Sequence, residues 1–429
     1  MNAPDRAFQH PGGGNLHAIS FVRGRVGPQS YAVAEAGSQA NGRSQRPRGP
    51  RRRGRFIVLA LVIALGVQVP LVLSLGHLTG HAWPFGALGV LLTAGFLSNL
   101  LGPRSIWGAP GPWRLYGTLW PFFIWWTASL LFLLIVPLAL LVAELFSIRT
   151  DHALLGALGL AVLAAFRTLG QRPRLQERDI FIEGLPQAFD GFRIAQISDL
   201  HCGPFASGPR VAGWMAAVNR LQPDLIAVTG DLIASGDAFV PVVASALGQL
   251  RAPHGVFACM GNHDYFADGE GLAQAIAAEG VTVLRNRGVE VPRHGARLFV
   301  AGVDDTWTGR HDIDLALAAR PAGVATVLLA HDPALFPEAA ERGVELTLSG
   351  HTHGGQLGLP FFARRVNLAR IITRFTSGFY RLGSAALYVN RGLGTTGPPV
   401  RLGVSPELGL LTLRRAEPGT VAQAAEAAE

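Results

Sequence analysis

The chain has 429 residues, a formal net charge of +8 and a hydrophobic fraction of 49% against only 15% charged residues. This apolar content exceeds that of an ordinary soluble domain, so it excludes a wholly soluble protein and predicts a part that lies in a membrane. All 37 basic residues are arginines. Together with abundant Ala and Gly, this indicates a codon bias, and no nucleic-acid partner is expected. The two cysteines, Cys202 and Cys259, cannot form a disulfide framework.

The first 55 residues predict a disordered basic tail. They end in "RSQRPRGPRRRGR", which mixes Arg with Gly, Pro and Ser and has no apolar period. The last residues, 416–429, are predicted to form a second disordered tail.

Four apolar stretches follow the basic tail, at residues 56–78, 83–101, 119–143 and 153–169. A helix that crosses the ~30 Å hydrocarbon core needs about 20 apolar residues. By this measure the first and third stretches are long enough, the second is adequate and the fourth is short. We therefore predict a four-helix transmembrane region over residues 56–170. Buried core helices are one alternative, and a cleaved signal peptide is another for the first stretch.

The arginines also predict an orientation. They lie before the first stretch, between the second and third, and after the fourth. Short basic loops stay on the cytoplasmic side, so a multi-pass protein of the bacterial inner membrane, with its C-terminal domain in the cytoplasm, is expected. However, "RRRGRFIVLALVI" is one residue away from a twin-arginine export signal. If the fourth stretch fails to cross, the C-terminal domain faces outward instead.

The pattern changes at Ile180 to short β-rich runs that alternate with helical ones. The runs typical of strands are "FRIAQIS", "DLIAVT", "GVFACM", "RLFVAGV", "VATVLLA" and "VELTLS". Between the first two, Val211, Trp214, Met215 and Val218 keep helical spacing. Alternating strands and helices predict an α/β domain over residues 180–415.

Five of these strands end in polar motifs, namely "DLH", "GD", "GNHD", "HD" and "GHTH". Ligands of α/β sheets bind outside the carboxyl ends of strands, so the motifs should converge at one edge. A single Asp or Asn in such a place is usually a turn or cap residue, and a single His is usually a surface residue. Five motifs in order favour a shared site. The groups gathered are Asp199, His201, Asp231, Asn262, His263, His331, His351 and His353.

Imidazoles, carboxylates and an amide oxygen without a thiolate suit Mn, Fe, Co or Zn. Eight groups are too many for one ion and enough for two. Two ions ~3.5–4 Å apart share a bridging ligand and a water of lowered pKa, which is machinery for attack on phosphorus.

The motif series over residues 199–353 resembles the calcineurin-like metallophosphoesterase superfamily. "LPQAFDGFRIAQISDLH" and "FYRLGSAALYVNRGLGTTGPPVRLGVSPELGLLTL" are similar to its bacterial branch of small phosphodiesterases. The front end is similar to transmembrane proteins with a metallophosphoesterase domain. The resemblance implies a C-terminal metallophosphoesterase domain of two packed mixed β-sheets flanked by helices, behind the transmembrane region.

The resemblance also implies roles for the motif residues. One divalent ion would be held by Asp199, His201 and His353, the other by Asn262, His331 and His351, with Asp231 as the bridge. A metal-bound hydroxide would attack a phosphodiester or pyrophosphate. His263 would contact the phosphoryl oxygens and protonate the leaving group, and Asp264 would orient its ring.

The residues after the last motif supply candidate substrate contacts, namely Phe361, Phe362, Arg364 and Arg365. Aromatic rings could hold acyl chains and guanidinium groups could hold phosphates. The alternative is that the rings pack under a loop and the arginines are solvated.

The expected function is that of a membrane-anchored phosphohydrolase. By resemblance, its lipid-linked substrate would be a molecule such as UDP-2,3-diacylglucosamine of lipid A biosynthesis. A general phosphodiesterase of soluble nucleotides and a non-catalytic scaffold are the alternatives. The oligomeric state stays open.

Overall fold

The computed structural model describes residues 61–101, 110–169, 171–359, 362–363, 365–417 and 419. The predicted basic tail over 1–55 lies outside the described residues, and so does nearly all of the predicted tail over 416–429. Two of the four candidate substrate contacts, Phe361 and Arg364, also lie outside them.

Each of the four predicted apolar stretches contains a helix: α2 (Val69–Thr79), α3 (Trp83–Leu101), α5 (Trp120–Leu145) and α6 (Thr150–Leu169). Within the described residues, three helical stretches are long and apolar enough to cross a membrane: Leu61–Thr79, Pro112–Leu145 and Thr150–Leu169. The apolar residues of α3 are interrupted by glycines, Ser98 and Asn99, and α3 is not among the three. A count of four crossings is therefore not confirmed.

The third predicted stretch begins earlier than its apolar residues indicate. A short helix, α4 (Pro112–Arg114), and a π-helical turn, η1 (Leu115–Leu119), lead directly into α5. Pro112 lies in the first turn of α4, where proline is favourable because the missing N–H has no helical partner there.

Small side chains let the apolar helices pack closely. Ala157, Ala161 and Ala165 of α6 recur at every fourth residue and are buried in a cluster with residues of α2 and α5. Polar contacts add to this packing, because Gln68 donates to Thr93 (3.1 Å) and accepts from the Trp125 ring (2.8 Å). These contacts hold the helices of the apolar region to one another.

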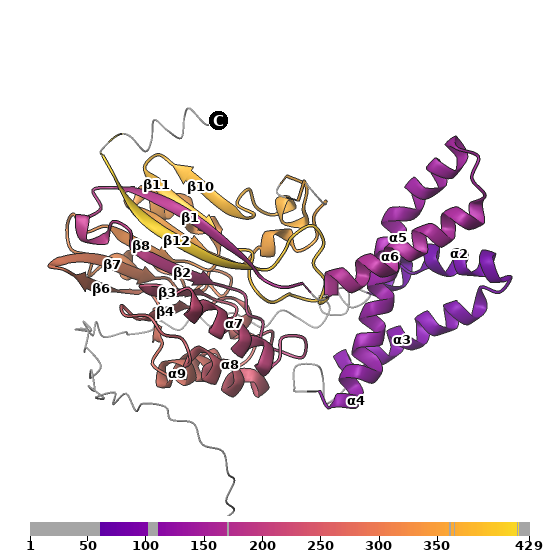
Figure 1. Cartoon of the computed structure of the whole chain (residues 1–429). Coiled ribbons are helices and arrows are strands. Elements are labelled where there is room, and N and C mark those ends of the chain that lie inside the picture. The colour runs from indigo at the N-terminus through magenta and orange to yellow at the C-terminus, as the bar shows by residue number, and fades with distance from the viewer. Residues whose placement is uncertain are drawn as a thin grey trace, which may run out of the picture. The chain divides into compact units, whose positions relative to one another are not determined.

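Two six-stranded mixed sheets form the rest of the fold (Figure 1), which confirms the predicted fold class. The first sheet has the order β1 (Arg174–Glu183), β12 (Glu407–Ala416), β2 (Arg193–Ile197), β3 (Leu225–Thr229), β4 (Val256–Cys259) and β5 (Thr282–Val283). The second has the order β10 (Gly378–Leu382), β11 (Ala385–Val389), β9 (Leu346–Ser349), β8 (Thr326–Leu329), β7 (Ala296–Gly302) and β6 (Arg287–Arg293). All six predicted strands are present.

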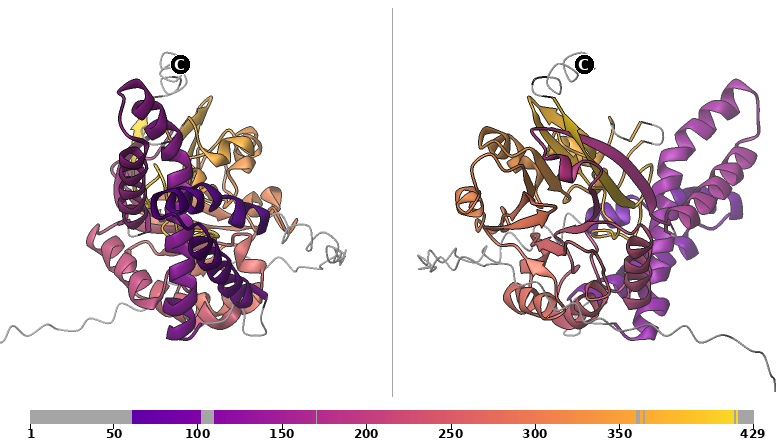
Figure 2. Two further views of the ribbon diagram at one scale, coloured as in Figure 1. Left: turned by 90° about the vertical axis from the view of Figure 1, so that its right-hand side faces the viewer. Right: turned by 60° about the vertical axis from the view of Figure 1, so that its left-hand side comes forward.

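One hydrophobic core lies between the two sheets. Ile194, Ala227 and Phe257 of the first sheet are buried in one cluster with residues of the second, such as Val327 and Leu348. Helices α7 (Gly208–Arg220), α8 (Val240–Leu247) and α9 (Gly269–Ala278) cover the other face of the first sheet, and Figure 2 shows them gathered on one side. Helices α10 (Ile313–Leu317) and α11 (Phe336–Glu341) pack on the second sheet. Both faces of the central strands are thus buried, which explains their continuous apolar runs.

Candidate metal centre

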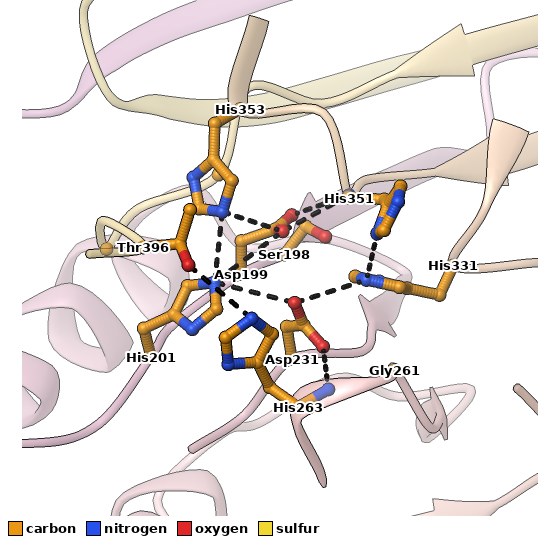
Figure 3. A network of polar contacts seen from close by, with 12 residues as sticks. Ser198, Asp199, His201, Asp231, Gly261, His263, His331, His351, His353 and Thr396 are labelled. Carbon is orange, nitrogen blue, oxygen red and sulfur yellow. Dashed lines mark hydrogen bonds and ion pairs between the residues drawn. The ribbon is translucent and has the colours of Figure 1, made fainter. Parts of the chain in front are cut away.

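The polar motifs of both sheets meet at one place (Figure 3). Asp199 and His201 follow β2, Asp231 follows β3, and Asn262 follows β4, all in the first sheet. The second sheet contributes residues after β8 and β9, namely His331, His351 and His353. Three sets of three have ligand atoms within 4.8 Å of one another. The first set is Asp199, His201 and His353, and the second is Asp231, His331 and His351. A third, His201, Asp231 and His263, overlaps both.

Asp231 lies between the two sets. Its Oδ2 is 3.5 Å from Nε2 of His201 and 3.3 Å from Nε2 of His331. One carboxylate oxygen therefore faces a histidine of each set (Figure 3). This is the position that a bridging ligand requires.

Within each set the ring nitrogens converge. Nε2 of His201 and Nε2 of His353 are 2.9 Å apart, and the latter is 3.3 Å from Oδ1 of Asp199. In the other set, Nδ1 of His351 is 3.2 Å from Nε2 of His331. Such clusters of nitrogen and carboxylate oxygen match the coordination that Mn, Fe, Co and Zn accept.

The backbone of the site residues is strained. Five of the seven expected metal ligands have positive φ, namely Asp199 (50°), His201 (42°), Asp231 (54°), His351 (69°) and His353 (51°). Residues other than glycine seldom adopt this region, and each such residue costs about 1–3 kcal/mol. The fold therefore holds these side chains in place at a cost to its stability, which is typical of functional sites.

Asn262 gives a direct test of whether a cation fits. Its side chain is buried, and its Oδ1 has no hydrogen-bond partner among the described residues. A buried amide oxygen without a partner costs about 1–3 kcal/mol. A cation at this place would satisfy the oxygen, so the residues present fit a divalent metal with nitrogen and oxygen ligands.

Comparisons with known proteins agree with this geometry. The family model of the calcineurin-like phosphoesterases matches residues 192–355. An uncharacterised metallophosphoesterase of Bacillus subtilis, YkuE, is 35% identical over 239 residues, which cover 54% of this chain and 82% of that protein. The chain belongs to the calcineurin-like metallophosphoesterase family.

Two further relatives extend the comparison. A zebrafish transmembrane protein with a metallophosphoesterase domain is 32% identical over 272 residues, or 60% of this chain and 61% of that protein. The chain thus spans less than two thirds of that relative. An uncharacterised metallophosphoesterase of Aquifex aeolicus is 32% identical over 248 residues, or 56% of this chain and 92% of that protein. This protein is thus a metal-dependent phosphoesterase that also carries helices able to cross a membrane.

Burial sets the charge of the phosphoesterase site. It lowers the pKa of His201 to about 3 and raises that of Asp199 to about 6. For Asp231 burial acts upward, but the nearby His331 holds the pKa of this carboxyl well below its usual range. Two buried carboxylates therefore lie at the centre, beside imidazole groups that burial keeps neutral at His201 and His353.

The ring of His263 is held by a carbonyl group. Its Nδ1 lies 2.8 Å from the carbonyl oxygen of Ala234, and its Nε2 lies 3.4 Å from Oγ1 of Thr396. Its backbone N–H donates to Oδ1 of Asp231 (2.9 Å). The ring edge thus faces the centre, at the place where the sequence analysis expects a proton donor.

The expected contact between Asp264 and this ring is wrong. The Asp264 carboxylate instead accepts from the backbone N–H groups of Leu232, Ile233 and Gly261, at 2.8–3.2 Å. The reason is local geometry, because in the turn after β4 neighbouring side chains point in different directions. Asp264 therefore joins the loops after β3 and β4, and burial raises its pKa to about 7.

Arg401 is a site residue that the sequence analysis misses. It is 2% exposed, and its Nη2 lies 3.1 Å from Nδ1 of His353. The guanidinium also donates to the carbonyl groups of Arg391, Gly392 and Gly394. A single arginine between apolar residues of "PPVRLGV" is the one sequence signal that could have found it.

Two exposed aromatic rings flank the site, and neither belongs to one of the five polar motifs. Trp307 is 58% exposed and its ring lies 5.2 Å from that of His351. Phe266 is 57% exposed and lies 4.5 Å from the ring of His263. A planar or apolar part of a substrate could pack against either ring.

The described candidate substrate contacts, Phe362 and Arg365, are exposed. In contrast, Phe375 is buried against Phe336 with a ring distance of 5.6 Å. Cys202 and Cys259 are buried, and burial raises the pKa of the Cys202 thiol to about 12. A thiol so hard to ionise is a poor metal ligand.

Proposed function

We propose that this phosphoesterase holds two divalent cations and hydrolyses a phosphodiester or pyrophosphate at a membrane. Asp199, His201 and His353 would hold one cation, and a second set would hold the other: Asn262, His331 and His351. Asp231 would bridge the two cations. The carrying observation is that one oxygen of Asp231 faces a histidine of each set, at 3.5 Å and 3.3 Å. The cations would be Mn, Fe, Zn or Co.

Bound cations would supply an activated water and neutralise charge on the phosphoryl oxygens. The chain's own contribution to the reaction is His263. The Ala234 carbonyl accepts from its Nδ1–H, so Nε2 is the nitrogen that gives or takes the transferred proton. Imidazole suits this role because one ring nitrogen can exchange a proton while the other is held by a hydrogen bond.

The substrate that we propose is lipid-linked, for example UDP-2,3-diacylglucosamine in lipid A biosynthesis. Three described helical stretches long enough to cross a membrane would keep the site near lipids. The exposed Phe362 and Arg365 would meet an acyl chain and a phosphate, respectively. In this proposal the arginines after Leu169 keep the domain on the cytoplasmic face of a bacterial inner membrane.

A second candidate is a general phosphodiesterase of soluble nucleotides. The observation that favours it is the pair of exposed rings, Trp307 and Phe266, beside the metal ligands. A nucleobase could stack on either ring.

The test is hydrolysis by the full chain in detergent with added Mn²⁺. Bis-p-nitrophenyl phosphate and UDP-2,3-diacylglucosamine are compared side by side, with His263→Ala and Asp231→Asn as controls. Faster turnover of the lipid nucleotide that both variants strongly reduce would support the lipid-linked substrate. Turnover of the diester alone would favour the second candidate. If a folded, metal-loaded protein hydrolyses neither compound, the result would favour the non-catalytic scaffold alternative over both candidates.

A further inference from the structure

A loop excursion leaves the metal site immediately after its last histidine. We call residues 357–376 the excursion. Its N-terminal half closes on itself, since Gly358 bridges to Asn367 and Leu368 N–H donates to the Leu357 carbonyl at 3.2 Å. Its far end returns to the site, because Oγ1 of Thr352 donates to the Thr376 carbonyl at 2.6 Å. Thr352 lies between His351 and His353, so the excursion is rooted in the metal centre.

The excursion exposes large aliphatic side chains. Ile371 is 82% exposed and Ile372 is 84% exposed, the highest values among the exposed large hydrophobic residues of the described chain. Full burial of such a side chain would contribute about 1.5–3 kcal/mol of stabilising free energy, which is absent while the side chain stays in water. The neighbouring Phe375 is buried, and its ring packs against those of Phe336 and Tyr380. The excursion is therefore anchored to the domain next to its exposed isoleucines. The exposed apolar residues of the excursion are Leu359, Phe362, Val366, Leu368, Ile371 and Ile372.

The charge of the excursion has a single sign. Arg365, Arg370 and Arg374 are exposed, and residues 357–377 contain no Asp or Glu. Exposed aliphatic residues interleaved with arginines fit the boundary between acyl chains and anionic headgroups. A second copy of the same surface would bring like charges together, which disfavours a dimer through this face.

We propose that the excursion docks on an anionic lipid bilayer. Ile371 and Ile372 enter the acyl boundary, and the arginines pair with lipid phosphates. This contact is additional to the membrane-crossing helices and turns one face of the phosphoesterase domain toward the lipid. It does not depend on which substrate the site hydrolyses.

A fluorescence experiment with the full chain in nanodiscs tests the proposal. Ile371→Cys is labelled with an environment-sensitive dye, since both native cysteines are buried. The discs contain phosphatidylcholine alone or with phosphatidylglycerol, and a lipid with a nitroxide near its headgroup is the quencher. Leu315→Cys is the matched control, because Leu315 is 48% exposed and lies on α10, which packs near β6 and β7 at the opposite edge of the second sheet from β10.

The expected result is loss of most of the dye fluorescence at position 371 in anionic discs and little loss at position 315. Arg370→Gln with Arg374→Gln should remove most of the quenching at 371, because the attraction to anionic headgroups is lost. Turnover of soluble bis-p-nitrophenyl phosphate by the same variants reports whether the domain is folded.

Equal quenching at positions 371 and 315 would overturn the proposal. A second result would also overturn it: the dye emission at position 371 is blue-shifted, the nitroxide lipid does not quench it, and the shift depends on the number of protein copies per disc. The latter result would identify the surface as a contact between two copies of the chain. Neither result would bear on the substrate, which is tested separately by hydrolysis.

Discussion

The two halves of the proposed binuclear metal centre have the same kinds of candidate ligand but differ in what lies behind them. In the half with Asp199 and His201, the distal nitrogen of His353 faces the buried guanidinium of Arg401 at 3.1 Å. In the other half, the distal nitrogen of His331 faces the Thr229 carbonyl at 2.7 Å. A carbonyl that accepts a hydrogen bond makes a histidine more basic, whereas a nearby cation makes it less so. The Arg401 half should therefore bind its cation more weakly.

The pKa values of His353 and His331 differ as these contacts predict, with that of His331 higher. Burial, His201 and Arg401 together hold the pKa of His353 well below its usual range. Burial acts downward on His331 too, but Asp231 outweighs it and raises the pKa to about 10. The same kinds of candidate ligand would thus face different electrostatic surroundings at the two proposed cation positions.

The largest effect is expected from the residue that both halves share. Asp231→Ala should remove both cations and lower turnover about 10⁴-fold, because bound cations contribute several kcal/mol to the transition state. Elemental analysis of the purified variant gives the metal content. A variant that keeps one cation per chain would show that Asp231 belongs to one half only.

His263→Ala tests a residue that belongs to neither half. We expect about a 10²-fold loss of turnover, since a positioned acid contributes this much or more. The metal content should stay at the wild-type value. The loss should be larger for an alkyl than for an aryl leaving group, and equal losses would argue against proton donation by His263.

Replacement of the buried guanidinium addresses the difference between the halves directly. Arg401→Met should raise the affinity of the weaker cation about tenfold, the lower limit for changes around metal ligands. It should also lower the melting temperature, because buried carbonyl groups lose their donor. A stepwise metal titration measures the first effect, with Arg381→Met, which contacts the Phe181 carbonyl instead, as control. A weaker second cation would mean that Arg401 chiefly positions the ring.

The smallest effect is expected at the rim of the second half. Trp307→Ala should raise KM for a nucleotide-containing substrate about fivefold, near the lower limit for loss of a base-stacking ring. The value of kcat should change little, because Trp307 touches His351 by its ring and provides no ligand atom. A matched change at Phe266, beside His263, shows whether stacking is confined to one half.

The candidate ligands of both proposed halves could be named from the sequence, whereas their surroundings could not. Each ligand follows an apolar strand within a few residues, so one local pattern marks both the strand and the chemistry. Arg401, Thr396 and the Ala234 carbonyl lie near the site only through the folded chain. The orientation of Asp264 depends on the turn after β4, which no spacing rule describes.

The strands likewise fall into a group that the sequence predicts and a group that it does not. The strands buried on both faces were predictable from continuous apolar runs. Strand β1 begins "RLQERD", and most of its residues are exposed, so it lacks the apolar pattern of a central strand. Strand β12 is buried along most of its length, but its place beside β1 depends on pairing across more than half of the chain. The helix α3 shows the converse limit, since the apolar stretch predicted a membrane-crossing helix, and the helix is present but its crossing is not confirmed.

The position of β12 has a consequence for biosynthesis. Among the described strands, β1 pairs only with β12, and β12 also separates β1 from β2. A ribosome makes residues 174–183 long before residues 407–416, and domains begin to fold while the rest of the chain is still being made. The first sheet can therefore acquire β1 and β12 only after residues 407–416 have been made. Until then β1 and the edge of β2 stay open to wrong partners, so a truncation within 407–416 should give aggregated rather than merely inactive protein.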